Sequence, residues 1–419
     1  MKNRKKFNWN LYLSLFCLAF IPTIYETIKI FFINTSSTSL DVLSQMEWFD
    51  LIDEILVTFL TIPLYALLNN YKENKEIFKK KIFQSFIICL TIYTLFLIIV
   101  YIYANHLVSF MQSTNILQTI HYLRLETIAF MIGIIYTFFS VIFIIIGKSK
   151  YIYTFLMVKM LGLIIGDSIF IQQFGTYGVA YTNIIVNTLL GIAVIVIMIK
   201  EKLMIISFEN IIDIVFLKQW FKIGLFVGIQ IFLDNWIYAV MVCKMINKVS
   251  AQGNYWIANT FIWSWLLVPC TCLTDIIKRD CEENREKQQL KNYWKIIISI
   301  FTIWIITIPT WKYFLRYFMQ VKNVEEIVKI VLMLVPFYLF YMIAAIFDNI
   351  FYGLGKTTYN MIISVVVNIL YYGIVYILFK HHFFEMNIQF IIYMFGFGMV
   401  VHCFISFVLW TKLKKSKTP

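Results

Sequence analysis

Long apolar segments recur along the whole chain and limit what it can fold into more than any other feature. A mostly hydrophobic segment of about 20 residues is long enough to cross the ~30 Å hydrocarbon core of a bilayer as a helix. Only 14% of the 419 residues are charged and 61% are hydrophobic, which leaves too few polar side chains to cover a soluble protein of this size. We count about twelve such segments: 8–33, 43–69, 82–104, 120–146, 151–172, 176–199, 219–246, 252–277, 292–315, 327–353, 358–379 and 386–411. The sequence therefore predicts an all-α polytopic membrane protein with about twelve transmembrane helices.

Several markers recur at one interval and indicate an internal duplication. Glu26 in the first apolar segment and Asp234 in the seventh are 208 positions apart. Segments 147–151 and 355–359, which both begin with Gly-Lys and end with Tyr, are separated by the same 208 positions. We therefore expect two six-helix halves related by a pseudo-twofold repeat, as in many transporters. The expected bounds are 1–200 for the N-terminal bundle, 201–218 for a cytoplasmic connector and 219–419 for the C-terminal bundle.

Positive charge is distributed unevenly between the two sides of the predicted membrane protein. The chain carries 36 Lys and Arg and a net charge of +13. When the ends and loops are assigned alternately to the two sides, most of these residues fall on the side that holds both termini. This is the positive-inside pattern, which places both termini in the cytoplasm and requires an even number of spans. Membrane orientation explains the excess of basic over acidic residues, so we expect no nucleic-acid partner.

Carboxylates inside the apolar segments are the strongest indication of function. An ionised carboxylate at the centre of a transmembrane helix costs ~2.5–3.5 kcal/mol on insertion scales, so it is expected to face the protein interior or water. In the second segment Glu47, Asp50, Glu54, Thr58 and Thr61 follow spacings of three and four, which places them on one helix face. We predict that this face lines an aqueous cavity. The alternative is a buried carboxylate network that ties helices together.

Three further segments carry candidate site residues. In the seventh, Gln230, Asp234 and Tyr238 share one face, with Asp234 near the bilayer centre. The alternative there is a carboxylate satisfied by hydroxyl groups of a neighbouring helix. In the tenth, Asp348 lies toward the cytoplasmic side, where a helix-end role is the alternative.

Glu26 is the candidate in the first segment. Lys29 is one turn away, so an intrahelical ion pair is the alternative to a cation site at Glu26. Four other acids lie near segment ends, where we expect interfacial or capping carboxylates: Glu47, Glu126, Asp167 and Asp275.

The intramembrane acids outnumber the intramembrane bases, and the chain is rich in aromatic residues, with 40 Phe, 26 Tyr and 11 Trp. A cavity lined by carboxylates and aromatic rings suits an organic cation, because charge attraction and ring-face contact add together. The same carboxylates can exchange protons or hold Na⁺. Substrate and coupling ion would then compete for one set of acids, each stabilising a different face of an alternating-access cycle.

Several short motifs, in their order along the chain, resemble those of the multidrug and toxic compound extrusion (MATE) family. Segment 122–124 (Tyr-Leu-Arg) is similar to the opening of the family's fourth span, and segment 175–183 to the small-residue turn between its fifth and sixth spans. Segment 167–170 resembles the Asp-containing end before that turn, although Ser168 stands where the family usually has Pro. The two Gly-Lys segments resemble its Gly-containing loops.

The resemblance covers nearly the whole chain and extends to the larger superfamily that includes lipid-linked oligosaccharide flippases (MOP). It implies twelve spans in two six-span halves. It also places Asp234 in the span where some sodium-coupled members keep an acid, and Glu26 where most members keep an Asp. The Glu in place of Asp is a departure from the family pattern.

The expected function is a secondary active antiporter of the bacterial plasma (inner) membrane. It would export amphipathic, cationic organic compounds in exchange for Na⁺ or H⁺, as a monomer in the lipid bilayer, with no cofactor besides the coupling ion and no metal. The expected ion-coupling and substrate-binding residues are Asp234, Glu26, Asp50, Glu54, Asp348, Gln230 and Tyr238.

Two rival functions remain. A lipid-linked oligosaccharide or polysaccharide flippase requires basic residues along its cavity, and only Lys29, Lys159 and Lys244 are available. A membrane-embedded enzyme requires a catalytic loop or a metal-spaced cluster. His381, His382 and Glu385 in a short external loop are the sole hint of one. We therefore expect a chain that is not an enzyme.

Overall fold

The computed structural model describes residues 7–36, 40–71, 73–207, 213–282 and 286–416. Every regular element in these ranges is a helix, either α (labelled α) or π (labelled η). Eleven helices are long and apolar enough to cross a membrane, and the number is twelve if the bent pair Gln252–Leu266 and Val268–Cys281 counts as one span. The predicted all-α class and the number of spans are therefore confirmed.

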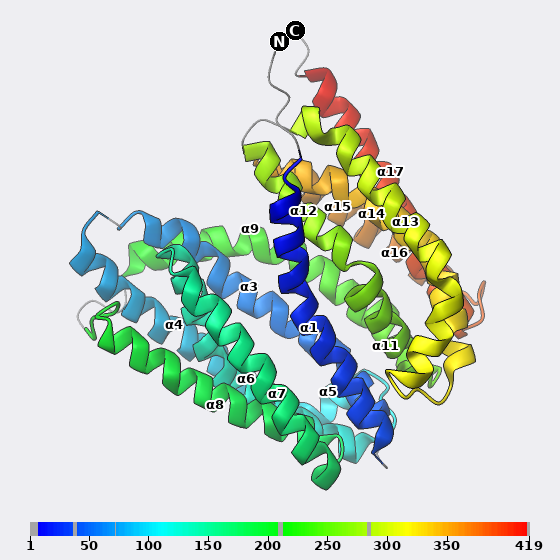
Figure 1. Cartoon of the computed structure of the whole chain (residues 1–419), viewed down its shortest axis with the longest axis horizontal. Helices are drawn as coiled ribbons and strands as arrows, with labels where there is room; N and C mark the ends of the chain where they lie inside the picture. Colours follow the sequence, from blue (N-terminus) through cyan, green and yellow to red (C-terminus); the bar gives the residue numbers. More distant parts are fainter. Residues whose placement is uncertain (1–6, 37–39, 72, 208–212, 283–285, 417–419) are drawn as a thin grey trace. The chain divides into compact units, whose positions relative to one another are not determined.

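The chain forms two compact units, and the first comprises residues 35–239. Its helices pack around α6, which contacts α8, α4 and α3, while α3 packs along α9 (Figure 1). The helices of this unit are α2 (Asp41–Ser44), α3 (Glu47–Asn69), α4 (Lys75–Ile102), α5 (Ala104–Phe110), α6 (Ile116–Ile145), α7 (Ser149–Phe174), α8 (Tyr177–Lys200) and α9 (Ile214–Tyr238).

The second unit joins residues 1–34 to residues 240–419. Helix α14 lies at its centre and contacts α17, α12, α13 and α11. The helices are α1 (Trp9–Thr35), η1 (Ala239–Cys243), α10 (Lys244–Lys248), α11 (Gln252–Phe261), η2 (Ile262–Leu266), α12 (Val268–Glu282), α13 (Glu286–Tyr317), α14 (Val324–Gly353), α15 (Thr357–Val365), η3 (Val366–Tyr371), α16 (Tyr372–Lys380) and α17 (Ile388–Ser416).

The two compact units do not share the bounds of the expected halves, 1–200 and 219–419, because α1 and α9 each pack with the opposite set of helices. Two glycines explain the position of α9. A Cβ atom at Gly224 would be 2.9 Å from the backbone oxygen of Phe59, and one at Gly228 would be 3.2 Å from the Phe59 ring. This Gly-x-x-x-Gly pair lets α9 approach α3 closely, as small residues do between membrane helices. The indole nitrogen of Trp220 also donates to the carbonyl oxygen of Leu60 at 3.1 Å.

Helix α1 is held by hydrogen bonds to residues more than 200 positions later. The Tyr12 hydroxyl donates to the Pro269 carbonyl at 2.9 Å, and the Thr23 hydroxyl donates to the Ser264 carbonyl at 2.8 Å. The indole nitrogen of Trp265 donates to the Thr27 hydroxyl at 2.9 Å. The carbonyl groups of Ser264 and Pro269 lie on either side of the break between η2 and α12, where regular helical bonding is interrupted. Residues 208–212 of the expected connector lie outside the described residues.

The repeat seen in the sequence is reproduced in the backbone at two helix ends. Helices α6 and α14 are each followed two residues later by a glycine with positive φ, +75° at Gly147 and +67° at Gly355, a conformation that other residues rarely adopt. The next amide bonds back to the carbonyl of Phe143 in the first turn and of Phe351 in the second, at 2.8 Å in both. These two rings also contact Tyr151 and Tyr359, respectively, with centroids 5.1 Å apart in each case. The matching geometry at an offset of 208 residues supports an internal duplication.

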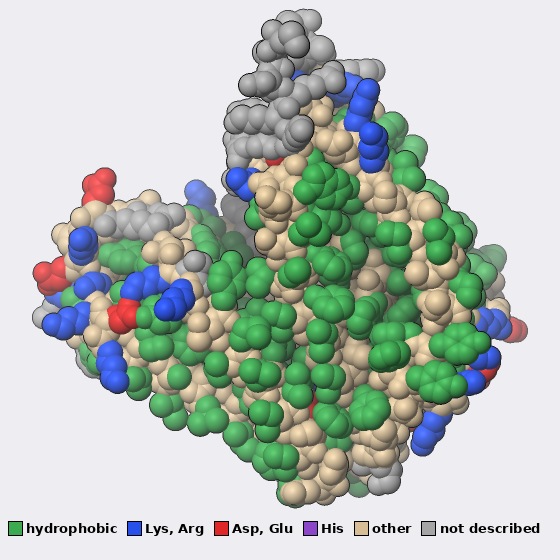
Figure 2. Space-filling model, viewed as in Figure 1, with side chains coloured by type: hydrophobic (Ala, Val, Ile, Leu, Met, Phe, Trp, Pro, Cys, Tyr) green, Lys and Arg blue, Asp and Glu red, His purple; other side chains and the backbone are tan. Residues whose placement is uncertain are grey.

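The outer surfaces of the helices suit a lipid environment. Hydrophobic side chains are spread over the face seen in Figure 2, whereas Lys, Arg, Asp and Glu gather near the margins of the view. Ile165 on α7, Leu189 on α8 and Ile306 on α13 are each at least 60% exposed. A soluble protein rarely exposes apolar surface on this scale. The chain is therefore a multi-span membrane protein.

Candidate functional site

The acidic face of α3 is the centre of the candidate site in the unit 35–239. Asp50 and Glu54, one turn apart, are both exposed, and Glu47 is half-buried. They share a face because the helix advances 3.6 residues per turn. Asp53, which lies between them in sequence, is directed to another helix, where it accepts a hydrogen bond from the Tyr93 hydroxyl of α4. Helical spacing therefore distinguishes Asp50 and Glu54, which are accessible, from Asp53, which links α3 to α4.

Polar side chains of α9 meet this acidic face. The amide nitrogen of Asn235 donates to the Glu54 carboxylate at 3.0 Å and to the Leu51 carbonyl at 2.9 Å. The Tyr238 hydroxyl lies 3.4 Å from a carboxylate oxygen of Glu47. Asp234 precedes Asn235 and is exposed, while Gln230 one turn earlier is half-buried. Among the predicted site residues, this pair of helices therefore carries Asp50, Glu54, Gln230, Asp234 and Tyr238. We name the set of Glu47, Asp50, Glu54, Asp234 and Asn235 the α3–α9 acidic face.

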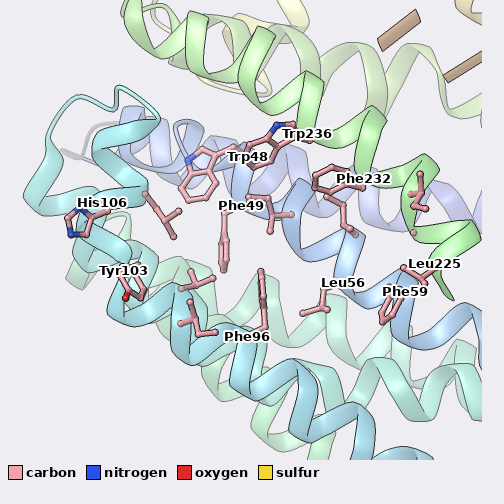
Figure 3. Close-up of a pocket in the computed structure, with 17 residues that line it drawn as sticks. Trp48, Phe49, Leu56, Phe59, Phe96, Tyr103, His106, Leu225, Phe232 and Trp236 are labelled. Carbon is pink, nitrogen blue, oxygen red and sulfur yellow. The ribbon is translucent and has the colours of Figure 1, made fainter. Parts of the chain in front are cut away.

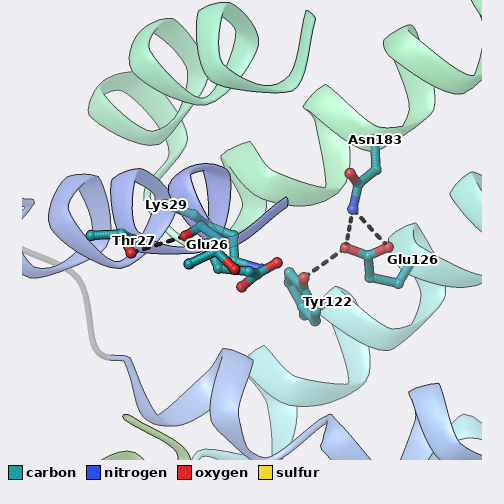
Figure 4. A network of polar contacts seen from close by, with 7 residues as sticks. Glu26, Thr27, Lys29, Tyr122, Glu126 and Asn183 are labelled. Atoms are coloured by element: carbon teal, nitrogen blue, oxygen red, sulfur yellow. Dashed lines mark hydrogen bonds and ion pairs between the residues drawn. The ribbon is translucent and has the colours of Figure 1, made fainter. Parts of the chain in front are cut away.

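Glu26 belongs to the other unit and is engaged with its neighbour on α1. Its carboxylate lies 2.7 Å from the Lys29 ammonium, the intrahelical ion pair that was the alternative to a cation site (Figure 4). The ammonium lies 5.3 Å from the centroid of Tyr25 and 5.8 Å from that of Trp256, within cation–π range. The negative charge of Glu26 is therefore balanced within its own helix.

Glu126 does not have the interfacial or capping role expected from its position near a segment end. It lies on α6 with only 5% of its surface exposed, so it is buried inside the unit 35–239. It accepts a hydrogen bond from the Tyr122 hydroxyl at 2.6 Å and from the Asn183 amide of α8 at 3.0 Å (Figure 4). Asp167 is also buried, at 1% exposure, rather than interfacial. The expectation was wrong for both residues because each lies well inside its helix, where the packing of α6, α7 and α8 buries the side chain.

Asp348 forms a second polar site, in the unit that contains α14 and α17. Its Oδ1 atom accepts a hydrogen bond from the Ser406 hydroxyl at 2.7 Å, and its Oδ2 atom lies 2.8 Å from Nε2 of His402. The Asp348 backbone carbonyl accepts a hydrogen bond from the Asn360 amide of α15 at 3.2 Å. We name Asp348, His402 and Ser406 the Asp348 cluster. Both carboxylate oxygens are therefore occupied by side chains of α17 that the sequence reading did not identify.

No group of three or more His, Cys, Asp or Glu side chains in the described part of the chain is arranged to hold a metal ion. His381 and His382, in the loop between α16 and α17, are exposed. The transmembrane acids therefore remain the main chemical feature of both units.

An apolar cavity of about 660 Å³ lies between α3, α4, α5 and α9 in the unit 35–239 (Figure 3). Phe49, Leu56 and Phe96 form part of its wall, and Phe232 and Trp236 of α9 close another side. Tyr103 and His106 stand together at one end of it (Figure 3). A volume in this range suits the apolar part of a small organic molecule.

A second cavity, of about 520 Å³, lies among α1, α11, η2, α12 and α13. Three of its tryptophans have the indole nitrogen bonded, Trp265 to Thr27, Trp304 to the Leu266 carbonyl and Trp311 to Thr307. The rings are fixed in orientation, so this cavity presents aromatic faces and edges. Both cavities suit compounds with a large hydrophobic part.

No family model matches the chain, and no curated protein is detectably similar in sequence. Solved transporter structures are similar in fold. An inward-facing multidrug resistance MATE family transporter of the MOP superfamily matches with a TM-score of 0.75 and 16% identity, over 97% of this chain and 99% of that one. A MOP superfamily transporter from Pyrococcus furiosus Vc1 matches with a TM-score of 0.71 and 15% identity, over 97% and 95%. A mutant of the Vibrio cholerae MATE transporter VcmN matches with a TM-score of 0.69 and 16% identity, over 98% of both chains. At sequence identities of 15–16%, the structural similarity establishes the fold alone.

Proposed function

We propose, from a fold shared with MATE transporters, that this chain is a secondary active antiporter that exports amphipathic, cationic organic compounds in exchange for Na⁺ or H⁺. It would work by alternating access in the bacterial inner membrane, as a monomer with both termini in the cytoplasm. A transporter fold agrees with the prediction that the chain is not an enzyme.

The α3–α9 acidic face is the observation that carries the proposal. Glu54 is exposed and its hydrogen-bond donor is the neutral amide of Asn235, so the bond orients the carboxylate without cancelling its charge. Asp50 and Asp234 add two accessible acids to the same pair of helices. Negative charge held in a low-dielectric environment attracts a cation more strongly than it would in water.

An apolar cavity on the same two helices supports a substrate with a large hydrophobic part. It shares α3 and α9 with the acidic face, and its lining contributes hydrophobic side chains such as Ile52, Leu56 and Phe232. The apolar part of a substrate would fit this cavity, whose lining residues on α3 and α9 lie on other helix faces than the acids. Intramembrane carboxylates of this kind commonly mark substrate and ion pathways.

The flippase alternative depends on free intramembrane bases. Lys29 is paired with Glu26 at 2.7 Å, so its charge is already balanced. The Lys159 ammonium lies over the Tyr136 ring, 5.2 Å from its centroid. We therefore favour organic cations over lipid-linked saccharides.

The test is transport of ethidium, an aromatic lipophilic cation, into proteoliposomes that contain the purified protein, under an imposed Na⁺ or pH gradient. Wild type is expected to move ethidium against its gradient, and Glu54→Gln and Asp234→Asn are expected to slow this at least tenfold. Glu76→Gln is the matched control, because Glu76 lies in the first turn of α4 and pairs with Lys80.

Folded wild type that moves no cation under either gradient would contradict the proposal and would favour the flippase. Equal loss in Glu54→Gln and Glu76→Gln would show that the α3–α9 acidic face has no special role.

A further inference from the structure

We propose that the cavity among α1, α11, η2, α12 and α13 binds one acyl chain of an anionic phospholipid, whose phosphate lies at the start of α13. We name this cavity, which is lined by residues within 9–16, 261–269 and 296–314, the α1–α13 groove. The proposal concerns the surrounding membrane lipid, so it goes beyond the proposed transport function and does not depend on it.

The α1–α13 groove opens on the outer surface of two membrane spans. Trp9 and Leu13 of α1 and Ile303 of α13 line it and are 53%, 54% and 57% exposed, respectively. Both helices are long and apolar enough to cross a membrane. An unfilled groove leaves its wall without van der Waals contacts on one side. In a bilayer, the acyl chains around the protein are the molecules that can supply these contacts.

The starts of α1 and α13 lie toward the same end of the groove. The Tyr12 hydroxyl donates to the Pro269 carbonyl at 2.9 Å, and the Trp304 indole nitrogen donates to the Leu266 carbonyl at 3.0 Å. Both helices thus pass the same part of the broken span, beside the junction of η2 and α12. The lining of α13 continues from Trp304 back to Ile296, toward its start.

The other end of the groove is closed by buried aromatic rings. Trp311 of α13 and Phe261 of α11 are each 3% exposed, and their ring centroids are 5.7 Å apart. Fifteen positions separate Ile296 from Trp311, which is about 22 Å along a helix. One leaflet contributes about half of the ~30 Å hydrocarbon core. The groove is therefore long enough for a single acyl chain that enters from the start of α13.

Positive charge at this end identifies the kind of lipid. Lys291 and Lys295 lie in the two helical turns before Ile296, and both are exposed. From position 287 to position 317, α13 contains no Asp or Glu that could balance them. Basic residues next to a membrane span attract anionic head groups at the membrane surface. An apolar groove that begins beside two lysines is complementary to a phospholipid with a net negative charge.

The acids of the neighbouring helix α12 are engaged with other groups. Asp275 is paired with Lys278 at 3.1 Å. Asp280 accepts a hydrogen bond from the Tyr293 hydroxyl at 2.7 Å. Neither carboxylate is shown bonded to Lys291 or Lys295, so a lipid phosphate can approach these two ammonium groups.

Bound lipid would also stabilise the broken span. Tyr12 and Trp304, which donate to carbonyl groups on either side of the break, are both part of the groove wall. A chain packed against them would hold these donors in place. A ligand that binds the folded form raises its stability by mass action. Phosphatidylglycerol added to the protein in detergent should therefore raise its melting temperature.

The direct test is photochemical labelling of the full chain in phosphatidylcholine nanodiscs. These contain a small fraction of phosphatidylglycerol with a diazirine on one acyl chain, and labelled peptides are identified by mass spectrometry. Wild type is expected to be labelled within 9–16 and 296–314, at least fivefold more than by phosphatidylcholine that carries the same diazirine.

A variant that fills the groove tests the position of the chain. Ile303→Trp is expected to reduce this labelling at least tenfold. Ile306→Trp is the matched control, because Ile306 is 70% exposed on the same helix and does not line the groove. Leu13→Trp fills the groove from α1 and replaces Ile303→Trp if that variant does not fold. Labelling of both filled variants at the wild-type level would overturn the proposal.

A change of charge tests the head group. Lys291→Gln combined with Lys295→Gln is expected to lower the phosphatidylglycerol label to the phosphatidylcholine level. Lys322→Gln combined with Lys329→Gln makes the same change of charge near the start of α14 and is the control. An unchanged preference for phosphatidylglycerol in the first double variant would overturn the assignment of the phosphate to these lysines.

Two other occupants would also be recognised and would overturn the proposal. Displacement of the lipid label by ethidium would assign the groove to the transported compound. An unlabelled groove in a protein that is dimeric by light scattering would assign it to a second copy of the chain. Because the labelling does not require transport, it remains decisive even if the protein moves no cation.

Discussion

Glu54 on α3 and Asp348 on α14 are both carboxylates within membrane spans, but their surroundings differ. Glu54 is exposed and has the neutral amide of Asn235 as its donor. Asp348 has both oxygens occupied, by a hydroxyl and by an imidazole. The first carboxylate is accessible from outside the helices, whereas the second is enclosed by side chains of α17. The donors around a transmembrane acid therefore decide how accessible its carboxylate is.

The largest effect on stability is expected from Gly224→Ala, which disturbs the packing that holds the α3–α9 acidic face together. The added Cβ atom would lie 2.9 Å from the backbone oxygen of Phe59, which cannot rotate away. Overpacking of this kind costs about 1–3 kcal/mol, so the melting temperature in detergent should fall. Gly373→Ala is the control, because nothing lies within 4 Å of the new Cβ atom and alanine favours helix. Equal melting temperatures for the two variants would contradict the close approach of α9 to α3.

Ser406→Ala tests the enclosed site by removing one of the two donors to Asp348. The hydroxyl is fully buried at 0% exposure and donates at 2.7 Å. Loss of a hydrogen bond to a charged group costs about 1.5–3 kcal/mol, so a fall in melting temperature of similar size is expected. Ser299→Ala is a suitable control, because Ser299 is an exposed serine on α13. A Ser406→Ala variant as stable as wild type would mean that the hydroxyl does not support the carboxylate.

Asn235→Ala removes the donor to Glu54 on the α3–α9 acidic face. We expect it to change the free energy less than Ser406→Ala does. The amide donates to Glu54 at 3.0 Å, but Glu54 is exposed, and its charge remains after the change. A typical hydrogen bond contributes about 0.5–1.5 kcal/mol, so ethidium affinity should change by no more than roughly tenfold. The measurement is equilibrium binding of ethidium to the purified protein. A complete loss of binding would show that Asn235 itself contacts the substrate.

The smallest effect is expected from Asp213→Asn, outside the membrane spans. Hydrogen bonding to Lys81 at 2.8 Å, with the Phe216 and Val215 amides, lowers the pKa of the Asp213 carboxyl. A lowered pKa in the folded state adds stability above the unfolded value of about 3.9, and this stability is lost as pH falls through the folded value. Wild type should therefore melt slightly above Asp213→Asn at pH 7, and the difference should shrink in acid. Asparagine still caps α9, so a difference independent of pH would contradict the role of charge.

The sequence predicted the helical class, the spans and the acidic face of α3, because these depend on local spacing. It named the Glu26–Lys29 pair as an alternative for the same reason, since three residues separate the two. The partners of Asp348 could not be found in this way. His402 and Ser406 lie 54 and 58 residues away, on a helix whose register against α14 is set by tertiary packing.

The sequence also did not predict that α1 packs with residues 240–419, or that α9 packs with the helices of residues 35–239. The 208-residue offset describes how the chain repeats, whereas packing depends on contacts such as Gly224 against Phe59. That Gly-x-x-x-Gly spacing was the one signal in the sequence that indicated a close helix partner for α9. Nothing local to segment 8–33 indicated that Thr23 and Thr27 would bond to residues 264 and 265.

The long-range hydrogen bonds of α1 can form only after a much later part of the chain has been synthesised. Thr23 leaves the ribosome 241 residues before Ser264, the residue whose carbonyl it contacts. At ~5–20 residues per second, the first helix waits roughly 12 to 48 seconds in the bilayer before its partner is made. During that interval no later helix is present to balance the charge of the Glu26 carboxylate. Lys29 is the only basic residue within the same apolar segment, and it forms an ion pair with Glu26. The ion pair inside α1 thus lowers the free-energy cost of keeping this helix in the membrane before the other helices of its unit have been synthesised.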